Sequence, residues 1–265
     1  MGAKKYFRNQ FSLKRFSLEH EEAWDFYLCC WQRNRSPFPL LCLRFLVFVG
    51  CLSILITSMV MTGQRVNFGF WFIYMTHWGL FLITITGGLA FAVSARAYFR
   101  GPIDSTFGMP WYLKCYWVAY NMTLPVAFFI TIFYYILLTD LVEEYSVDPV
   151  LDLFIHGINS VLMFALLMTS QHPSHLLHFY HAVAFGLLYM IFGIIYYFAG
   201  GVSPFGDRWI YPMIDWSNPG PTVGIVFASA AGLIIMHFLV VLISVFRDWI
   251  SKKYVRNMNS MSLTS

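Results

Sequence analysis

The sequence predicts an all-α membrane protein, a bundle of six transmembrane helices. Hydrophobic residues make up 58% of the 265 residues and charged residues only 11%, a balance far from that of a soluble domain. The apolar residues also gather into six runs, each at least as long as the roughly 20 residues that a helix needs to cross the hydrocarbon core. We therefore expect membrane lipid to be a partner of this chain, and nucleic acid not to be one.

The six runs divide the chain into three parts. The predicted spans are residues 39–62, 68–95, 112–138, 150–170, 175–200 and 220–247. Residues 1–38 precede them and contain no apolar stretch of the kind that marks a cleavable signal peptide, so the first span is expected to insert the chain. Residues 248–265 form a short tail that becomes rich in Ser, Met and Asn after Arg256, and we expect this tail to be disordered.

The segment before the first span has a pattern of its own. Ser17 precedes an acidic turn, and Trp24, Tyr27, Leu28 and Trp31 follow at helical spacing. This pattern predicts an amphipathic helix that lies on the inner leaflet. Packing of the same apolar residues against the cytosolic ends of the bundle is the alternative.

The distribution of basic residues predicts the orientation. If the odd spans run outward, the cytosolic side collects Lys4, Lys5, Arg8, Lys14, Arg15, Arg33, Arg35, Arg96, Arg100, Lys114, Arg247, Lys252, Lys253 and Arg256, and the exterior side holds only Arg65 and Arg208. The positive-inside rule then places both termini in the cytosol and the loop from Thr139 to Pro149 outside. Arg44, five residues into the first span, is expected to reach back to the cytosolic headgroups.

The cysteines fit the same orientation. All five would lie in cytosolic or intramembrane positions, so no exterior disulfide is expected: they are Cys29, Cys30, Cys42, Cys51 and Cys115. Cys29 and Cys30 lie close to the membrane surface, where they either stay free or carry a palmitoyl group.

Polar residues inside the spans point to a candidate catalytic site. Asp152, His156 and Asn159 are three or four residues apart, so they share one face of the fourth span. At about 1.5 Å of rise per residue, Thr76 lies roughly 12 Å and His156 roughly 9 Å from the exterior ends of their spans, so the two can meet. Asp152 is placed to hold one imidazole nitrogen and direct the other toward the Thr76 hydroxyl, as an activated nucleophile requires. The alternative is that Thr76 is a packing residue.

Other histidines recur at every third position after the fourth span. They are His172, His175, His178 and His181. We interpret them as a polar stripe near the headgroups rather than as metal ligands, and we expect neither a metal nor another cofactor. The alternative is a haem protein with two stacked b-type haems, one between His77 and His156 and the other between His181 and His237.

The last loop and the last span carry packing signals. Trp209, Tyr211 and Trp216 are expected to form part of an aromatic belt at the exterior surface. Gly224, Ala228 and Gly232 are spaced four apart, which predicts a seam for close helix packing.

Three segments are distinctive enough to compare with known families: LDLFIHGINSVLM at 151–163, HPSHLLHFYH at 172–181 and IIYYFAGGVSPFGDRWIYPMIDW at 194–216. They resemble the rolling stone family of animal membrane proteins, and the match covers most of the chain. This resemblance implies a multi-pass protein of the plasma membrane, with the endoplasmic reticulum as the alternative. It also implies a developmental role such as myoblast fusion in myogenesis, and partners among other membrane proteins at cell contacts.

A more distant similarity carries chemistry. The segment FIYMTHW at 72–78 is similar to the threonine motif of the androgen-induced and androgen-dependent TFPI-regulating membrane proteins, which are intramembrane hydrolases of fatty acid esters of hydroxy fatty acids. This resemblance implies a hydrolase of long-chain fatty acid esters with Thr76 as nucleophile. The later motif of that family, His-Gly-Met-His-Thr, matches HGINS at 156–160, so its catalytic histidine falls on Asn159 while its first histidine is kept as His156. Its Trp-x-Tyr-Pro segment is matched by Trp209, Tyr211 and Pro212.

Overall fold

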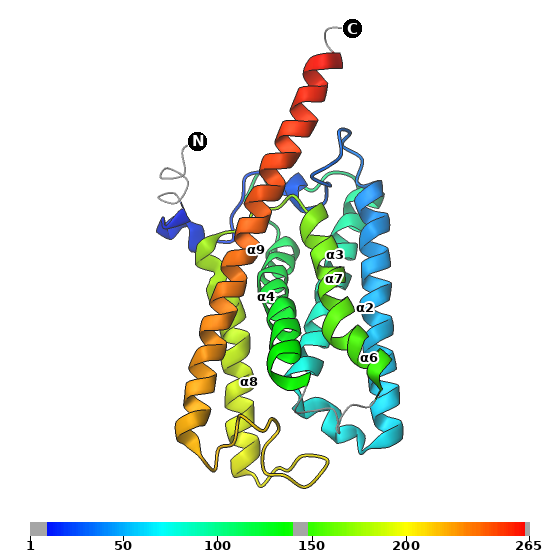
Figure 1. The fold of residues 1–265 in the computed structure, drawn as a ribbon. Helices are drawn as coiled ribbons and strands as arrows, with labels where there is room; N and C mark the ends of the chain where they lie inside the picture. The colour runs from blue at the N-terminus through cyan, green and yellow to red at the C-terminus, as the bar shows by residue number, and fades with distance from the viewer. Residues whose placement is uncertain (1–9, 140–147, 263–265) are drawn as a thin grey trace.

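The computed structural model describes residues 10–139 and 148–262, with the backbone alone beyond Val255 (Figure 1). The described part of the chain contains six helices that are long and apolar enough to cross a membrane. Its β-structure is confined to one isolated bridge between Tyr211 and Ile214. The predicted all-α, multi-span class is therefore confirmed. The cations Lys4, Lys5 and Arg8 and most of the loop from Thr139 to Pro149 lie outside the described residues.

The helices follow the predicted spans closely, apart from both ends of the second span and the end of the sixth. The first three spans are α2 (Phe38–Arg65), α3 (Met75–Arg100) and α4 (Trp111–Phe133), the last extended by the π-helical turn η4 (Tyr134–Leu138). The fourth combines α6 (Pro149–Leu153), the π-helical turn η6 (Phe154–Ile158) and α7 (Asn159–Thr169). The fifth is the 3-10 helix η7 (Leu176–Phe179) followed by α8 (Tyr180–Phe198), and the sixth is α9 (Pro219–Ser262).

The second span begins later than predicted. Residues Phe68–Ile73 form a separate 3-10 helix, η3, and Tyr74 has an extended backbone, so α3 starts only at Met75. The run through this break is uniformly apolar, which is why composition did not reveal it. Thr76 is therefore the second residue of its helix, and the depth of roughly 12 Å expected for it within the helix was wrong.

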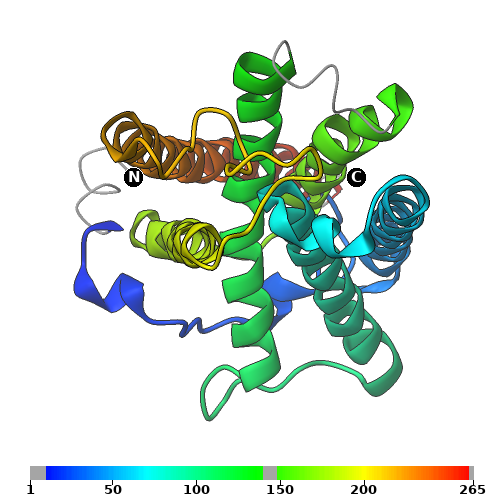
Figure 2. The same ribbon diagram turned by 90° about the horizontal axis from the view of Figure 1, so that it is seen from below.

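Helix α4 is the centre of the bundle. It contacts α3 and α7 on one side and α8 and α9 on the other, while α2 packs against α3 and α7. Figure 2 shows this arrangement along the bundle axis, with α4 between the two groups. The side chains of α4 accordingly include several of the most buried in the protein: Leu113, Tyr116, Trp117, Leu124, Val126 and Ala127.

The bundle has two ends, which we name by their position relative to the chain termini (Figure 1). The proximal end carries both described termini and is formed by residues 10–37, 101–110, 170–175 and 248–255. The distal end is formed by the last turn of α2, residues 66–74, residues 199–218 and the start of α6.

Small residues allow close helix contacts at a few positions. A Cβ atom at Gly87 of α3 would lie 3.3 Å from the Cα atom of Phe48 in α2, so the two backbones approach closely there. In α9, a Cβ at Gly232 would lie 2.8 Å from the ring of Phe129, whereas one at Gly224 would meet nothing within 4 Å. The predicted seam of small residues is therefore a packing site at Gly232 and not at Gly224.

Between residues 11 and 37 the chain forms no α-helix, contrary to the prediction of an amphipathic helix there. It contains the 3-10 helices η1 (Leu13–Phe16) and η2 (Ala23–Phe26). We call residues 10–37 the N-terminal strap, because they cross the proximal end of the bundle (Figure 1). Phe26 is completely buried, stacked on His172 at 5.2 Å and edge-on to Trp117 at 5.3 Å. The alternative, packing of the apolar residues against the bundle, therefore describes this segment.

Arg44 does not reach back to the headgroups; its side chain is fully buried. Its guanidinium donates to the carbonyl oxygens of Phe26 (2.8 Å) and Ala90 (3.2 Å) and to the hydroxyls of Ser94 (2.8 Å) and Tyr116 (3.1 Å). These partners belong to the strap, α3 and α4. Hydrogen bonds to these three elements offset the free-energy cost of burying the charged guanidinium in the bundle core.

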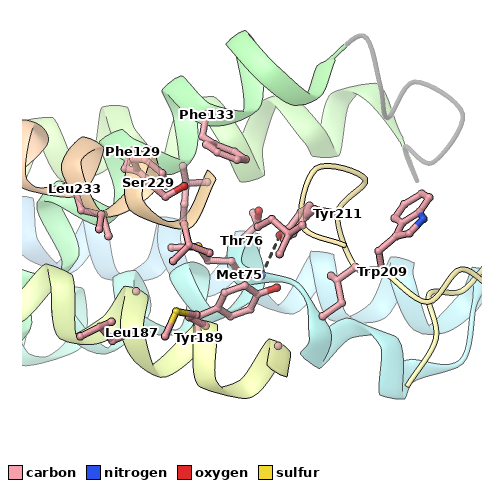
Figure 3. Close-up of a pocket in the computed structure, with 18 of the residues that line it drawn as sticks. Met75, Thr76, Phe129, Phe133, Leu187, Tyr189, Trp209, Tyr211, Ser229 and Leu233 are labelled. Carbon is pink, nitrogen blue, oxygen red and sulfur yellow. Dashed lines mark hydrogen bonds between the residues drawn. The ribbon is translucent and has the colours of Figure 1, made fainter. Parts of the chain in front are cut away.

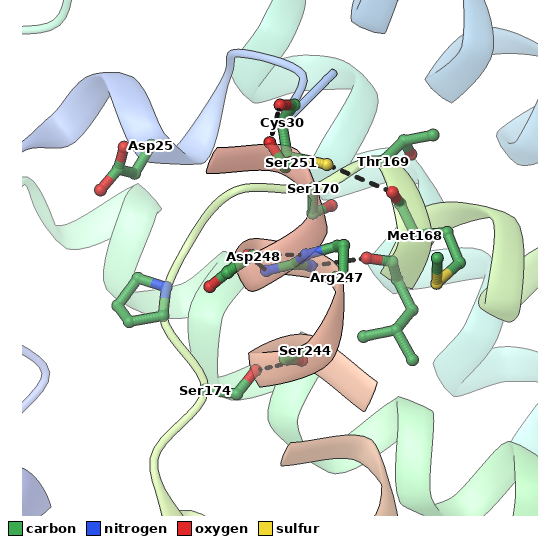
Figure 4. A network of polar contacts seen from close by, with 12 residues as sticks. Asp25, Cys30, Met168, Thr169, Ser170, Ser174, Ser244, Arg247, Asp248 and Ser251 are labelled. Carbon is green, nitrogen blue, oxygen red and sulfur yellow. Dashed lines mark hydrogen bonds and ion pairs between the residues drawn. The ribbon is translucent and has the colours of Figure 1, made fainter. Parts of the chain in front are cut away.

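A second buried arginine joins α9 to α7 (Figure 4). Arg247 Nη1 donates to the carbonyl oxygen of Leu167 at 2.6 Å, and its Nη2 pairs with Asp248 at 2.7 Å. One turn further on, Ser251 donates to the carbonyl oxygen of Cys30 in the strap. Helix α9 therefore continues past residue 247, the predicted end of the span, and runs through the predicted disordered tail to Ser262.

The strap is also attached to the end of α7. The Cys30 thiol donates to the carbonyl oxygen of Met168 at 3.2 Å, and the Trp31 indole donates to the same oxygen at 2.6 Å. The Cys30 amide bonds the carbonyl oxygen of Thr169 at 3.2 Å. Together with Ser251 of α9, these bonds hold the strap, α7 and α9 to one another.

The histidines after α7 are buried, so the interpretation as a solvated polar stripe was wrong. His172, His175, His178, His181 and His237 all lie inside the protein. Asn121 donates to His178 Nδ1 at 2.9 Å, and His237 Nε2 donates to the carbonyl oxygen of His175 at 3.0 Å. Burial lowers the pKa of His175, in the loop between two spans, to about 3, so its ring is neutral at neutral pH. Among the described residues no group of three or more His, Cys, Asp or Glu side chains is placed to hold a metal ion. The haem alternative stays a prediction.

We predict that Arg44→Met strongly destabilises the protein. The substitution leaves several buried acceptors without a donor, at a cost of about 1–3 kcal/mol each, so the free energy of unfolding should fall by at least about 3 kcal/mol. Thermal unfolding of the purified protein measures this loss. The control is Arg35→Met, because Arg35 is exposed over the ring of Trp24 and its removal should change the midpoint little. Equal midpoints for the two variants would contradict the structural role assigned to Arg44.

Candidate functional site

Two adjoining cavities occupy the distal half of the bundle. The polar cavity, about 150 Å³ in volume, is lined by residues of η3–α3, the fourth span and the loop at 199–218, among them Thr76, His77, Asp152, His156 and Ser203. The apolar cavity, about 110 Å³, lies between α4, α8 and α9 (Figure 3) and is lined by residues such as Phe129, Phe133, Leu187 and Leu233. The two share a wall formed by Thr76, Tyr134, Leu138, Trp209, Ile210 and Tyr211.

Thr76 lies at the first turn of α3, where the backbone amides have no partner within the helix. The hydroxyl of Tyr211 accepts a hydrogen bond from the Met75 amide at 3.0 Å and is also hydrogen-bonded to the side chain of Thr76 (Figure 3). The N-terminus of a helix carries a partial positive charge. Negative charge that develops beside Thr76 would therefore be stabilised by the helix.

His156 is a neutral hydrogen-bond acceptor facing the polar cavity. Its Nδ1 bonds the backbone carbonyl oxygen of Asp152 at 3.1 Å, which places the ring proton on Nδ1 and leaves Nε2 as the acceptor. The ring stacks on Tyr134 with centroids 3.5 Å apart and an interplanar angle of 4°. Tyr134 and His156 belong to the π-helical turns η4 and η6. Such turns are frequent at functional sites, and here two of them meet at one cavity wall.

His77 offers a second neutral imidazole on the same cavity. Its Nδ1 bonds the carbonyl oxygen of Trp71 at 2.6 Å, and its ring stacks on the Trp71 ring at 4.4 Å. The Nε2 atom of His77 is therefore also the acceptor nitrogen. The site thus contains two imidazoles and one aliphatic hydroxyl, and no hydrogen bond joins Thr76 to His156 among the described residues.

The two residues expected to support the site have different positions. Asp152 lines the polar cavity, but it holds His156 through its backbone carbonyl, and its carboxylate is hydrogen-bonded to the hydroxyl of Tyr134. Asn159 is 1% exposed, lines neither cavity, and neither its amide oxygen nor its amide nitrogen has a protein partner. The structure therefore brings Thr76, Asp152 and His156 together and leaves Asn159 outside.

The sequence did not identify the tyrosines that shape this site. Tyr211 was expected in an aromatic belt, yet its hydroxyl points inward to the start of α3. Tyr189 of α8 similarly donates to the carbonyl oxygen of Ile73 at 2.7 Å, and Tyr134 supports the His156 ring. The one available signal was the match of Trp209, Tyr211 and Pro212 to the Trp-x-Tyr-Pro segment of the hydrolases.

The fold and its cavities define a multi-pass membrane protein with two adjoining cavities in the distal half of its bundle. The family model described as "Protein rolling stone" matches residues 3–261, so this chain belongs to the rolling stone family. The Protein rolling stone of Drosophila melanogaster is 28% identical over 225 residues, which cover 81% of this chain and 80% of that protein. No solved structure matches the chain.

We predict that Tyr211→Phe loosens the first turn of α3. The substitution removes the acceptor of the Met75 amide, so the free energy of local opening should fall by about 1–2 kcal/mol. Hydrogen–deuterium exchange of peptides spanning residues 72–80 measures this change. The matched control is Tyr98→Phe, in the last turns of the same helix. Because Tyr98 is exposed, this substitution should leave hydrogen–deuterium exchange at residues 72–80 unchanged. Unchanged exchange in both variants would show that Tyr211 does not cap α3.

Proposed function

We propose that the protein is an intramembrane hydrolase of long-chain lipid esters, with Thr76 as the nucleophile and His156 as the general base. The observation that supports this proposal is the place of Thr76 on the wall between the two cavities. A hydroxyl in this position meets an apolar chamber suited to an acyl chain on one side. On the other side it faces a chamber that contains a neutral imidazole.

The proposed reaction uses the groups already described. Ester binding turns the Thr76 hydroxyl from Tyr211 toward His156, a rotation about one side-chain bond. As Thr76 Oγ1 bonds to the acyl carbon, His156 Nε2 takes the hydroxyl proton and then gives it to the departing alcohol. Water, deprotonated by the same nitrogen, attacks the acyl-threonine and releases the carboxylic acid and free Thr76. The partial positive charge at the N-terminus of α3 stabilises the oxyanion.

His156 is a better base for Thr76 than His77. Successive residues of a helix point about 100° apart, so the side chains of Thr76 and His77 point away from one another. His156 comes from a different span and lines the same polar cavity as Thr76. Its ring is fixed by the carbonyl of Asp152 and by stacking on Tyr134, which reduces the ordering needed during the reaction.

We predict that Thr76→Ala and His156→Ala each lower the hydrolysis of a long-chain ester, such as p-nitrophenyl palmitate, by about 100-fold or more. The assay uses purified protein in nanodiscs. The controls are Thr57→Ala, on a lipid-facing position of α2, and His20→Ala, in the strap, which should keep wild-type rates. Mass spectrometry should find an acyl adduct on Thr76 in the wild type. Full activity in Thr76→Ala, or no activity in the wild type, would reject the proposed reaction.

A developmental role at the plasma membrane, such as myoblast fusion, is the second function that we propose. Membership of the rolling stone family and the similarity to the Drosophila protein favour it, and its partners would be membrane proteins at cell contacts. We also propose that both termini are cytosolic. Among the described residues the distal end carries only Arg65 and Arg208 as cations, which supports this orientation by the positive-inside rule.

We predict that depletion of the protein in cultured myoblasts lowers the fraction of nuclei in multinucleate cells, and that the wild-type chain restores it. Tagged protein should be found at the plasma membrane. If Thr76→Ala restores fusion, the developmental role does not depend on hydrolysis. If it does not restore fusion, the developmental role depends on Thr76. Normal fusion after depletion, with the protein confined to the endoplasmic reticulum, would contradict this role.

A further inference from the structure

A carboxylate lies in the wall of the polar cavity. Among the described residues that line this cavity, Asp152 is the one with a formal charge. It belongs to the first turn of α6, where the helix N-terminus favours the ionised form. Its carboxylate is hydrogen-bonded to the hydroxyl of Tyr134, another lining residue, and this neutral donor leaves the charge in place. The described wall of the polar cavity therefore has a formal charge of minus one.

The two imidazoles of the polar cavity add electron pairs to this wall. Nδ1 of His77 and Nδ1 of His156 each bond a backbone carbonyl oxygen, so each ring has its lone pair on Nε2. The two arginines at the distal end line other surfaces. Arg65 ends α2, and Arg208 lines the apolar cavity with its guanidinium 4.8 Å from the centre of the Tyr197 ring.

Aromatic rings form a corner of the polar cavity. The ring of Tyr74 lies edge-on to the ring of Tyr211, with centroids 5.9 Å apart and an interplanar angle of 71°. It also lies edge-on to the ring of His77, at 5.7 Å and 85°. All three residues line the cavity, and we call them the aromatic corner. The faces of tyrosine rings carry negative partial charge and attract cations, and rings that meet at a large angle present such faces from more than one side.

The size of the polar cavity limits what it can hold. Its volume of about 150 Å³ matches that of an engineered cavity of about 150 Å³ that binds benzene. A trimethylammonium group is about as large as benzene, and its methyl groups suit the apolar part of the lining, which includes Phe70 and Phe205. A bare ammonium group is more strongly hydrated and makes less use of such a wall. The cavity therefore suits the head of a small methylated amine.

We propose that the polar cavity binds a methylated ammonium group, such as that of choline, between Asp152 and the aromatic corner. This inference deepens the proposed function, because it names the alcohol part of the ester as an amino alcohol with a permanent positive charge. Thr76 lies on the wall between the two cavities (Figure 3). An ester carbonyl at Thr76 then directs its alcohol part into the polar cavity, where His156 gives a proton to the departing alcohol. The inference rests on the proposed function only where the cation belongs to a substrate.

The test is the binding of radiolabelled choline to purified protein in maltoside micelles, measured by equilibrium dialysis with empty micelles as the background. Choline has no ester bond, so this measurement does not depend on any reaction. The deciding competitor is the neutral carbon analogue of choline, in which a tert-butyl group replaces the trimethylammonium group. Unlabelled choline should displace the label at a concentration about 10-fold lower or more. Equal displacement by the two compounds would overturn the proposal.

Two substitutions locate the cation. Asp152→Asn keeps the shape of the side chain and should weaken choline binding by about 10-fold or more, because it removes the charge that attracts the cation. Its matched control is Asp104→Asn, the same change at an exposed site of the proximal end. Trp209→Leu removes a further ring from the lining and should weaken binding several-fold, whereas Trp111→Leu, at an exposed proximal site, should not. Wild-type affinity in both Asp152→Asn and Trp209→Leu would contradict the site.

Ethanolamine tests the methyl groups. It should displace labelled choline more weakly than choline does, and the opposite order would overturn the assignment to a methylated ammonium.

Hydrolysis distinguishes this inference from the proposed function. Palmitoylcholine and the palmitate ester of the neutral analogue share one acyl chain, so a cation site predicts a kcat/KM about 10-fold higher for palmitoylcholine. If neither ester is hydrolysed but choline binds with the stated selectivity, the proposed reaction fails and the cation site stands. If both esters are hydrolysed at equal rates and choline does not bind, the cation site fails and the proposed reaction stands.

Discussion

The structure depends on one constraint: every polar group inside the hydrocarbon layer must find its partner within the protein. Arg44 shows how far this constraint reaches. Its fully buried guanidinium collects oxygen atoms from the strap, α3 and α4, so the positions of three elements are fixed by one side chain. Arg247 does the same for α7 and α9. Apolar packing around α4 fills the space between helices, but these hydrogen bonds specify which turn of each helix faces which neighbour.

The same constraint explains what the sequence revealed and what it did not. Six apolar runs are enough to predict six helices, because hydrocarbon leaves the backbone no other way to satisfy its own polar groups. The break at Tyr74 was missed because aromatic residues continue through it without a change in composition. The strap was assigned the wrong structure because helical spacing of its aromatic residues suits a 3-10 segment packed on a bundle as well as an amphipathic helix. The fate of Arg44 and of the buried histidines depends on residues 18 to 126 positions away, which no local pattern encodes.

The candidate site illustrates a similar division. Spacing was sufficient to bring Thr76, Asp152 and His156 to one cavity, because the distal ends of α3 and the fourth span meet. It was not sufficient to predict the carbonyl that holds His156, which depends on a π-helical turn, or the inward direction of Tyr211, which depends on the path of a long loop. Asn159 lies one turn from His156 but lines neither cavity. Sequence spacing alone therefore does not predict which side chains share a helix face where a π-helical turn changes the helical register.

The attachment of the strap to α9 sets an order of assembly. Cys30 leaves the ribosome well before Ser251, which bonds its carbonyl oxygen. The proximal end therefore closes only after α9 has been synthesised. The strap that α9 helps to hold also supplies the carbonyl of Phe26 to Arg44. A chain that stops before α9 leaves this end open, with a partly satisfied guanidinium inside the membrane.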